Sequence, residues 1–405
     1  MRKKIVILFI LLLSCCGCFM FNEENNKEKN NKNEELDEIG KKVQETMNKM
    51  TIDEKIGQMI IVTYESPKMD NTLKSALIDV QPGGFLLFGD NITTYEETLN
   101  LIKEIKSYVN IPMFISIDEE GGNIQRLLKL QDYNITNIPF MYDIGSIDDE
   151  ELTYNVGKIL AEELRVFGIN MDFAPVIDVY SNKDNKVIGK RSFGTTPELV
   201  SKHGLKLAKG LEDNGVIAVY KHFPGHGNTS IDSHENLPIV NKTKDELLKE
   251  DLIPFIDAIN NDAKVIMIGH LAVPNITGDN TPASLSKKLI TDFLKKELNY
   301  SKLVVTDALN MKALTNYYSD SEICGKAVEA GVDILLMPSS SRKCLKSVQN
   351  ALKNGLITEE RINESVEKIL RLKYEKIVDN YDNYLPVEIL GSKEHNSIID
   401  KFGGD

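Results

Sequence analysis

The sequence predicts a (β/α)8 barrel, on three observations. Eight short apolar runs recur from about residue 45 onward, and they lack the apolar–polar alternation of half-exposed strands. Such runs are typical of strands buried on both faces of a parallel sheet. Amphipathic stretches with helical spacing separate them, and polar residues gather at one end of the runs. The runs are 57–64, 83–89, 111–118, 169–179, 216–222, 263–270, 302–308 and 332–338.

Helical patterns lie between these runs. Four are TLNLIKEIKSYV (98–109), NVGKILAEELRVFG (155–168), LVSKHGLKLAKGLEDNG (199–215) and KKLITDFLKKEL (287–298). Alternating strands and helices predict a parallel sheet covered by helices. A doubly wound open sheet has the same local pattern, and periodicity does not distinguish the two. No G-x-G-x-x-G follows a run, so dinucleotide binding has no support.

Length and charge narrow the class of protein. The chain has 405 residues, enough for one large or two ordinary domains. We interpret residues 41–380 as a single catalytic barrel and 381–405 as a C-terminal tail. The net charge of -13 argues against a nucleic-acid partner, because the phosphate backbone rewards clustered Lys and Arg.

The first residues have the pattern of an export signal. MRKK is a basic start, and IVILFILLL is a short apolar stretch followed by SCCGC. The segment LLSC resembles a bacterial lipobox, so we expect residues 1–18 to be a lipoprotein-type signal peptide with Cys15 acylated. Cys16 and Cys18 are weaker candidates, and a plain signal peptide is the alternative.

The residues after the signal predict a tether. Residues 21–37 contain almost no apolar side chains and bury too little surface to offset the entropy of ordering, so we interpret residues 19–40 as a disordered polar tether. The expected location is therefore that of an exported bacterial lipoprotein, membrane-anchored on the extracytoplasmic side through lipid chains. Cys324 and Cys344 remain beyond the signal; they do not make a disulfide framework, and we expect no role for them.

Residues 221–240, KHFPGHGNTSIDSHENLPIV, hold three of the six histidines. A zinc site is one interpretation, but Pro224 and Gly225 prevent the helix that would place His222 and His226 on one face. Proton transfer is a second, because a carboxylate beside an imidazole fixes its tautomer and stabilises its charged form.

The pair that suits proton transfer is Asp232 and His234, separated by one residue. A third interpretation is structural, with Asp232 capping a turn and His234 facing solvent. The residues of this segment alone leave these interpretations open.

Six segments in order resemble the β-N-acetylhexosaminidase branch of glycoside hydrolase family 3. The resemblance covers about residues 45–375 and implies a retaining hydrolase with a (β/α)8 barrel. Six motifs in the family's order make coincidence a poor explanation. The segments are IDEEGGNIQRL, which resembles D-x-E-G-G-x-x-x-R, then NKVIGKRSFG, KHFPGHG, D-S-H, IGHLAVPNI and VVTDALNMKAL.

The resemblance implies roles for three residues in the reaction. Asp307 matches the nucleophile that forms a covalent glycosyl-enzyme. Its alternative is a helix cap. His234, oriented by Asp232, matches a proton donor carried on a loop, and Gly225 and Gly227 could act as hinges of that loop.

Further positions match residues that bind the sugar. By resemblance Asp118 accepts hydrogen bonds from hydroxyls, while the arginines and the lysine donate them; for Arg126 and Arg191 a buried structural ion pair is the alternative. His226 is expected to shape the loop. No metal and no organic cofactor are implied. The implied sugar-binding set is Asp118, Arg126, Arg191, Lys221 and His222.

Two positions depart from the family's pattern. The usual Asp after H-G is Asn228 here, which removes a charge near the dyad and leads us to expect changed loop behaviour or pH optimum. The position after D-x-E-G-G, often Arg, is Asn123, which leads us to expect altered contacts outside the first sugar site.

The expected substrate is a terminal β-linked N-acetylglucosamine, on peptidoglycan fragments bearing N-acetylmuramic acid. One alternative is a family 3 β-glucosidase or a β-N-acetylglucosaminide phosphorylase, since a neutral histidine repels incoming phosphate less than a carboxylate does. The alternative from another class is a lipoprotein that binds muropeptides without cleaving them.

Overall fold

A computed structural model describes residues 37–229, 233 and 235–402. Its core is an eight-stranded parallel sheet in the order β10-β1-β2-β3-β6-β7-β8-β9. A parallel bridge between Val305 and Ile334 joins the two ends of this order, so the sheet closes into a barrel. The strands are β1 (Ile60–Thr63), β2 (Gly84–Leu87), β3 (Phe114–Ile117), β6 (Met171–Asp172), β7 (Ile217–Phe223), β8 (Val265–Ile268), β9 (Leu303–Thr306) and β10 (Leu335–Leu336).

The predicted barrel is confirmed. Each of the eight apolar runs contains a barrel strand, and only β7 extends one residue beyond its run. Nearly every strand residue is buried, because side chains alternately face the barrel interior and the surrounding helices. The sequential order with closure excludes the doubly wound sheet, in which the strand order reverses at a switch point.

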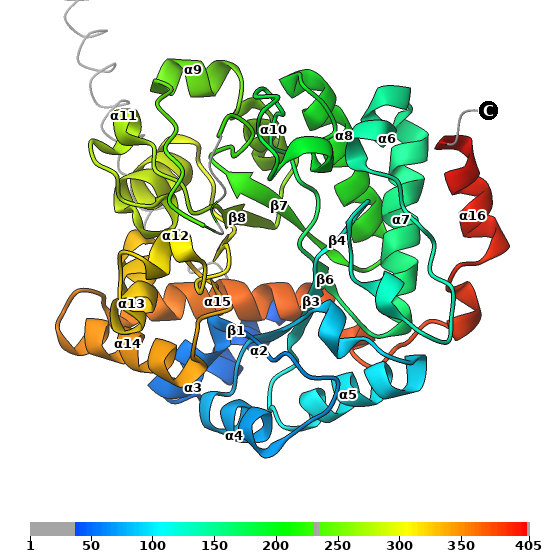
Figure 1. Cartoon of the computed structure of the whole chain (residues 1–405). Helices are drawn as coiled ribbons and strands as arrows, with labels where there is room; N and C mark the ends of the chain where they lie inside the picture. Colours follow the sequence, from blue (N-terminus) through cyan, green and yellow to red (C-terminus); the bar gives the residue numbers. More distant parts are fainter. Residues whose placement is uncertain (1–36, 230–232, 234, 403–405) are drawn as a thin grey trace, which may run out of the picture.

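Helices surround the barrel on its outside (Figure 1). The helical patterns expected at 98–109, 155–168 and 199–215 overlap α5, α7 and α8, each of which begins a few residues earlier, and the pattern at 287–298 contains the π-helix η5. No helix among the described residues is long and apolar enough to cross a bilayer. The helices are α2 (Glu38–Met47), α3 (Ile52–Gln58), α4 (Asn71–Val80), α5 (Tyr95–Ser107), α6 (Met141–Ile147), α7 (Glu150–Val166), α8 (Pro197–Asp213), α9 (Lys244–Lys249), α10 (Ile253–Asn260), α11 (Pro274–Thr277), η5 (Lys288–Glu297), α12 (Lys312–Thr315), α13 (Asp320–Ala330), α14 (Ser341–Lys353), α15 (Glu359–Lys376) and α16 (Lys393–Ile399).

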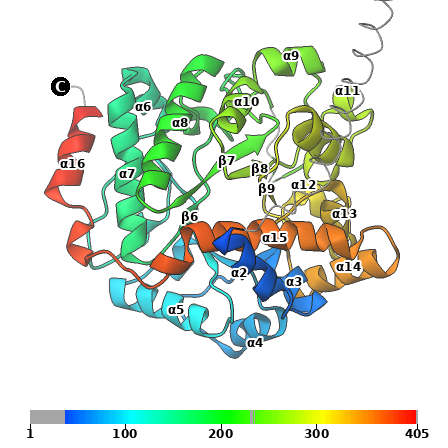
Figure 2. The same cartoon turned by 180° about the vertical axis from the view of Figure 1, so that it is seen from behind.

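Both ends of the described chain pack on the barrel. Helix α2 lies against α15, as the view from behind shows (Figure 2). Helix α16 lies against α7, where the buried His395 contacts Glu162 at 2.9 Å and Glu163 at 3.2 Å. Residues 381–402 of the expected tail therefore include ordered helix and follow the barrel surface.

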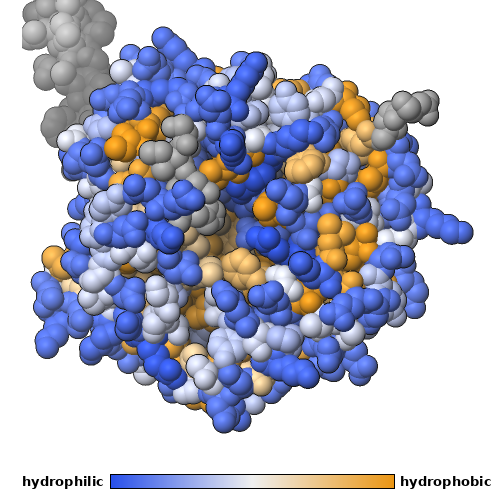
Figure 3. All heavy atoms as spheres, in the orientation of Figure 1, coloured by the Kyte–Doolittle hydropathy of each residue, from blue (hydrophilic) through white to orange (hydrophobic). Residues whose placement is uncertain are grey.

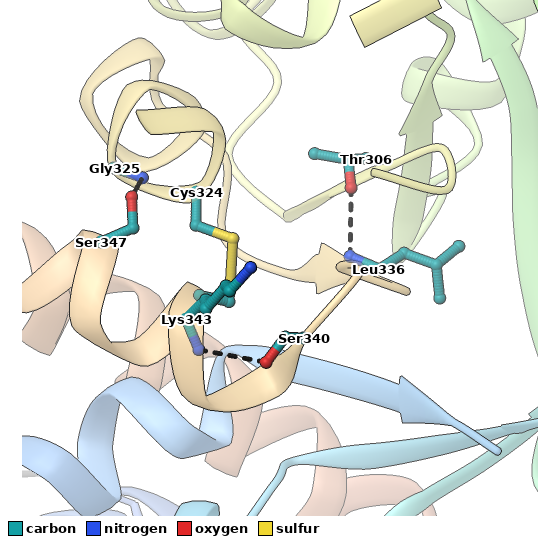
Figure 4. Close-up of a disulfide and its surroundings, with 8 residues drawn as sticks. Thr306, Cys324, Gly325, Leu336, Ser340, Lys343 and Ser347 are labelled. Carbon is teal, nitrogen blue, oxygen red and sulfur yellow. Dashed lines mark hydrogen bonds between the residues drawn. A yellow bond between two sulfur atoms is a disulfide. The ribbon is translucent and has the colours of Figure 1, made fainter. Parts of the chain in front are cut away.

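Cys324 and Cys344 form a disulfide, which corrects the expectation that they have no role. They lie on the consecutive helices α13 and α14, with Cα atoms 5.4 Å apart. Beside them the Ser347 hydroxyl accepts a hydrogen bond of 3.0 Å from the N–H of Gly325 (Figure 4). The spacing of the two cysteines did not reveal the pair, because only the packing of α13 on α14 brings them together.

Replacing both Cys324 and Cys344 by alanine is expected to lower the free energy of unfolding by about 3 kcal/mol, since cross-linking residues about 20 apart restricts the unfolded chain. Urea unfolding of wild type and variant, each with and without reductant, measures the effect. Reductant should lower the midpoint of the wild type and leave that of the variant unchanged. An unchanged wild-type midpoint would show that the disulfide adds no stability.

Candidate active site

A cavity of about 150 Å³ opens at the carboxyl ends of the strands. In Figure 3 the surface is hollowed near the middle of this face, where hydrophilic and apolar side chains meet. Charged and histidine side chains form one part of the lining, and aliphatic and methionine side chains form another. The lining residues are Leu86, Phe88, Asp118, Glu120, Ile124, Arg126, Val187, Arg191, Lys221, His222, His226, Ser233, Met267, Asp307, Ala308, Met311, Leu336 and Met337.

The ammonium group of Lys221 joins two carboxylates in this cavity. Its Nζ lies 2.9 Å from Oδ1 of Asp118 and 2.5 Å from Oε1 of Glu120. Burial alone would lower the pKa of Lys221, but Asp118 and Glu120 together raise it, so the side chain stays charged. Asp118 follows β3 and Lys221 lies in β7, so two strand ends bring this pair together.

Glu120 holds the second cation of the cavity. The guanidinium of Arg191 binds it through Nε at 2.7 Å and Nη2 at 2.8 Å, a two-pronged contact that fixes the arginine's plane. Burial alone would raise the pKa of Glu120, but Arg191 and Lys221 hold it well below its usual range. Glu120 was not among the predicted site residues, although the third position of D-x-E-G-G contains it.

A two-stranded hairpin, β4 (Glu119–Gly121) and β5 (Ile124–Gln125), carries this part of the lining. Arg126 directly after β5 lies 3.9 Å from Asp118 and stacks over Phe88, 5.6 Å from the ring centre. Its side chain is 27% exposed, and it lines the cavity. Both arginines therefore take part in ion pairs and also face the space where a ligand would bind.

Asp307 directly follows β9 and lines the cavity. Its Oδ1 accepts a hydrogen bond of 2.7 Å from the N–H of Ala308. Burial alone would raise the pKa of Asp307, but His222 and His270 lower it below its usual range. A partly buried carboxylate that remains ionised is what a nucleophile requires.

Asp178 orients the histidine segment and was not predicted from the sequence. It is fully buried, and its Oδ2 lies 2.7 Å from Nδ1 of His222, while its Oδ1 accepts the N–H of His226 at 2.6 Å. Burial alone would raise the pKa of Asp178, but His222 and His226 lower it. No signal in the sequence marked it beyond its position at the end of the run 169–179.

The segment 224–241, here called the β7 loop, leaves the barrel after β7. His226 contacts Thr229 through Nδ1 at 2.7 Å and Ser233 through Nε2 at 3.3 Å, so it shapes the loop as expected. Asp232 and His234 lie outside the described residues, as does Cys15. Ser233, the residue between the two members of the predicted pair, lines the cavity.

The two glycines of the β7 loop make close contacts. A Cβ on Gly227 would lie 1.7 Å from the carbonyl oxygen of Val179, and one on Gly225 would lie 2.7 Å from Cβ of Asp251. Gly225 also has φ +118°, which other residues rarely adopt. These contacts hold the start of the loop against its neighbours, so the structure gives these glycines a packing role, and the role as hinges stays a prediction.

Among the residues that the structure describes, no group of three or more His, Cys, Asp or Glu side chains could hold a metal ion. His222 of β7 and His226 of the β7 loop instead contact protein groups. His222 is bound to Asp178, and His226 is bound to Thr229 and Ser233. These contacts suit hydrogen-bonded imidazoles.

Comparison with known proteins identifies relatives of this chain. The family described as "Glycosyl hydrolase family 3 N terminal domain" matches residues 51–372. The chain is 29% identical over 390 residues to "Beta-hexosaminidase A" of Pseudoalteromonas piscicida, covering 86% of this chain and 65% of that relative. It is 30% identical over 329 residues to "Beta-hexosaminidase LpqI" of Mycobacterium tuberculosis, covering 79% and 82%.

A solved structure has the same fold over most of the chain. The glycoside hydrolase family 3 β-N-acetylglucosaminidase from Paenibacillus sp. str. FPU-7 superimposes with a TM-score of 0.82 at 33% sequence identity. The match covers 87% of this chain and 68% of that one.

Proposed function

Because the chain belongs to glycoside hydrolase family 3, we propose that it is a retaining exo-β-N-acetylglucosaminidase. Its β-hexosaminidase relatives and its β-N-acetylglucosaminidase structural neighbour support activity on N-acetylhexosaminides. The observation that carries the proposal is that the ionised Asp307 lines the same cavity as Asp118 and Lys221. A nucleophile and a set of charged hydrogen-bonding groups share the space that one sugar ring needs.

The reaction begins when the Asp307 carboxylate attacks the anomeric carbon, and the bond to the leaving group breaks. A covalent glycosyl-enzyme results, which water then hydrolyses with net retention of configuration. His234, oriented by Asp232, gives a proton to the leaving oxygen and later takes one from the water. Support for this pair is the resemblance of D-S-H together with Ser233, which lines the cavity.

The charged groups of the cavity suit sugar hydroxyls. Asp118 accepts hydrogen bonds from them, while Lys221, Arg126 and Arg191 donate. The apolar side chains of Met267, Met311 and Leu336 suit the methyl of an acetamido group. A cavity lined by both kinds of side chain suits an N-acetylated sugar.

The natural substrate proposed is a GlcNAc-bearing peptidoglycan fragment, met outside the cytoplasm by a lipid-anchored enzyme. The N-terminal segment with Cys15 supports export and anchoring. A buried disulfide between Cys324 and Cys344 adds support, because such bonds persist in oxidising compartments. Labelling cells with a radioactive fatty acid tests the anchor; absence of label in the wild type or label retained by Cys15→Ala would contradict acylation of Cys15.

Turnover of an aryl β-N-acetylglucosaminide, compared with the aryl β-glucoside and measured with and without phosphate, tests the activity. Preference for the N-acetylated sugar with water as acceptor is expected. Preference for the glucoside, or release of a sugar phosphate, would favour one of the alternatives. No turnover of either would favour a binding protein.

His234→Ala is expected to lower kcat/KM by about 10²- to 10³-fold for a substrate with a poor leaving group, and much less for a dinitrophenyl glycoside, which leaves without a proton. Asp232→Ala should follow the same pattern, and the double variant should be little worse than His234→Ala alone. Equal loss on both substrates would exclude His234 as the proton donor.

A further inference from the structure

Asp251 contacts residues at both ends of the β7 loop and is not among the residues that line the cavity. It precedes α10 and is fully buried. Its Oδ2 accepts a hydrogen bond of 2.5 Å from Nζ of Lys242, the residue directly after the β7 loop. Its Cβ packs against Gly225 at the start of that loop, where a methyl group would come within 2.7 Å. One side chain therefore contacts the loop's first turn and the residue after its end.

Neighbouring contacts fix the same two points. At the start, the carbonyl of His226 accepts a hydrogen bond of 2.8 Å from Asn185. At the end, the N–H of Val240 donates to the carbonyl of Ala272 at 2.9 Å. Between these points lies Ser233, which lines the cavity. The positions of the two loop ends therefore affect the shape of the cavity lining.

Burying the Asp251 carboxylate costs folding free energy, and this cost has no benefit if the residue has no other function. Its Oδ1 is buried and has no hydrogen-bond partner among the residues that the structure describes. Burial raises the pKa of Asp251 to about 6, against the lowering effect of Lys242. Lys242 and Glu250 are the charged side chains that face it, and Lys242 also binds Glu250 at 2.9 Å.

We propose that Asp251, paired with Lys242, is a positioning residue that joins the two ends of the β7 loop and thereby fixes His226 and Ser233, the described loop residues that line the cavity. This inference rests on the proposed function, since it concerns the loop that carries Asp232 and His234. Asp251 acts through the loop backbone and touches no substrate. Asp251 affects the reaction only through the geometry of the loop. It therefore supports the steps that need proton donation.

The test uses Asp251→Asn, which keeps the size that packs on Gly225, and Lys242→Met, which keeps the length of the lysine. Each is expected to lower kcat/KM about tenfold for a disaccharide with a poor leaving group and about twofold or less for the dinitrophenyl glycoside. The double variant should be no worse than either single variant, because both remove one pair. Glu250→Gln is the matched control: the residue is adjacent, contacts the same lysine and is partly exposed, so little change is expected.

Hydrogen exchange over residues 224–241 gives a readout that does not require activity. Asp251→Asn should accelerate exchange of this segment about tenfold relative to wild type and Glu250→Gln, while α8 is unchanged. Unchanged exchange, or equal losses of kcat/KM on both substrates, would overturn the proposal. Wild-type inactivity on both glycosides would instead contradict the proposed function, and the exchange result would still decide whether Asp251 holds the loop.

Discussion

Replacing Asp307 by alanine is expected to lower kcat/KM by about 10⁴-fold or more, because removal of the nucleophile leaves only binding and proton transfer to act on the substrate. The carboxylate lies at the strand end that faces the cavity and is partly buried near His222 and His270. Since these neighbours lower the pKa of Asp307, the acid limb of the pH profile should lie below the ordinary range for an aspartate. Asp320→Ala, on the surface at the start of α13, is the control and should leave the rate unchanged.

A second measurement separates loss of a nucleophile from general damage to the site. The space left in Asp307→Ala admits a small anion such as azide, which attacks the anomeric carbon from the face that Asp307 used. Azide should therefore restore turnover of an activated aryl glycoside and yield a glycosyl azide of inverted configuration. Activity within about tenfold of the wild type, with no effect of azide, would exclude Asp307 as nucleophile.

The barrel was predictable because burial on both faces leaves a pattern in the sequence of each strand. Runs such as 263–270 and 302–308 have no polar alternation, and burial on both faces is the physical reason. β8 and β9 lie within these two runs. No single run predicts closure, since it depends on the bridge between Val305 in β9 and Ile334 just before β10, at opposite ends of the strand order. The match to a known family, instead of periodicity, distinguished the barrel from an open sheet.

The positions of Asp118, Lys221 and Asp307 at strand ends were predictable from the sequence, whereas their partners were not. Asp178 lies in a long segment after β6 that has no regular structure, so no period marks its contact with His222. Glu120 precedes two glycines, so the sequence indicates a turn residue, whereas the structure places it in β4 of the β4–β5 hairpin. Long-range ion pairs depend on how loops from different strands meet, which local patterns do not encode.

Glu120→Gln tests whether the buried carboxylate that contacts Lys221 and Arg191 positions these two side chains in the sugar site. Glu120 is 2% exposed and contacts both Lys221 and Arg191. The amide keeps the shape and removes the charge, so two buried cations lose their shared partner. The free energy of unfolding should fall by about 3 to 5 kcal/mol, the usual result of breaking a buried pair from one side.

The catalytic consequence should be a loss of about 10²-fold in kcat/KM, carried mainly by KM. With its contact to Glu120 lost, Lys221 turns toward Asp118 and Arg191 loses the fork that fixes its plane, so both present their donors to the sugar in altered positions. Steady-state kinetics on the aryl glycoside, with thermal unfolding of the same preparations, measure the two effects. Lys190→Gln is the control, because this lysine neighbours Arg191 in sequence but pairs with the exposed Asp143. A stable Glu120→Gln variant with unchanged KM would show that Arg191 and Lys221 hold their positions without this carboxylate, and the site would then depend on Asp118 alone.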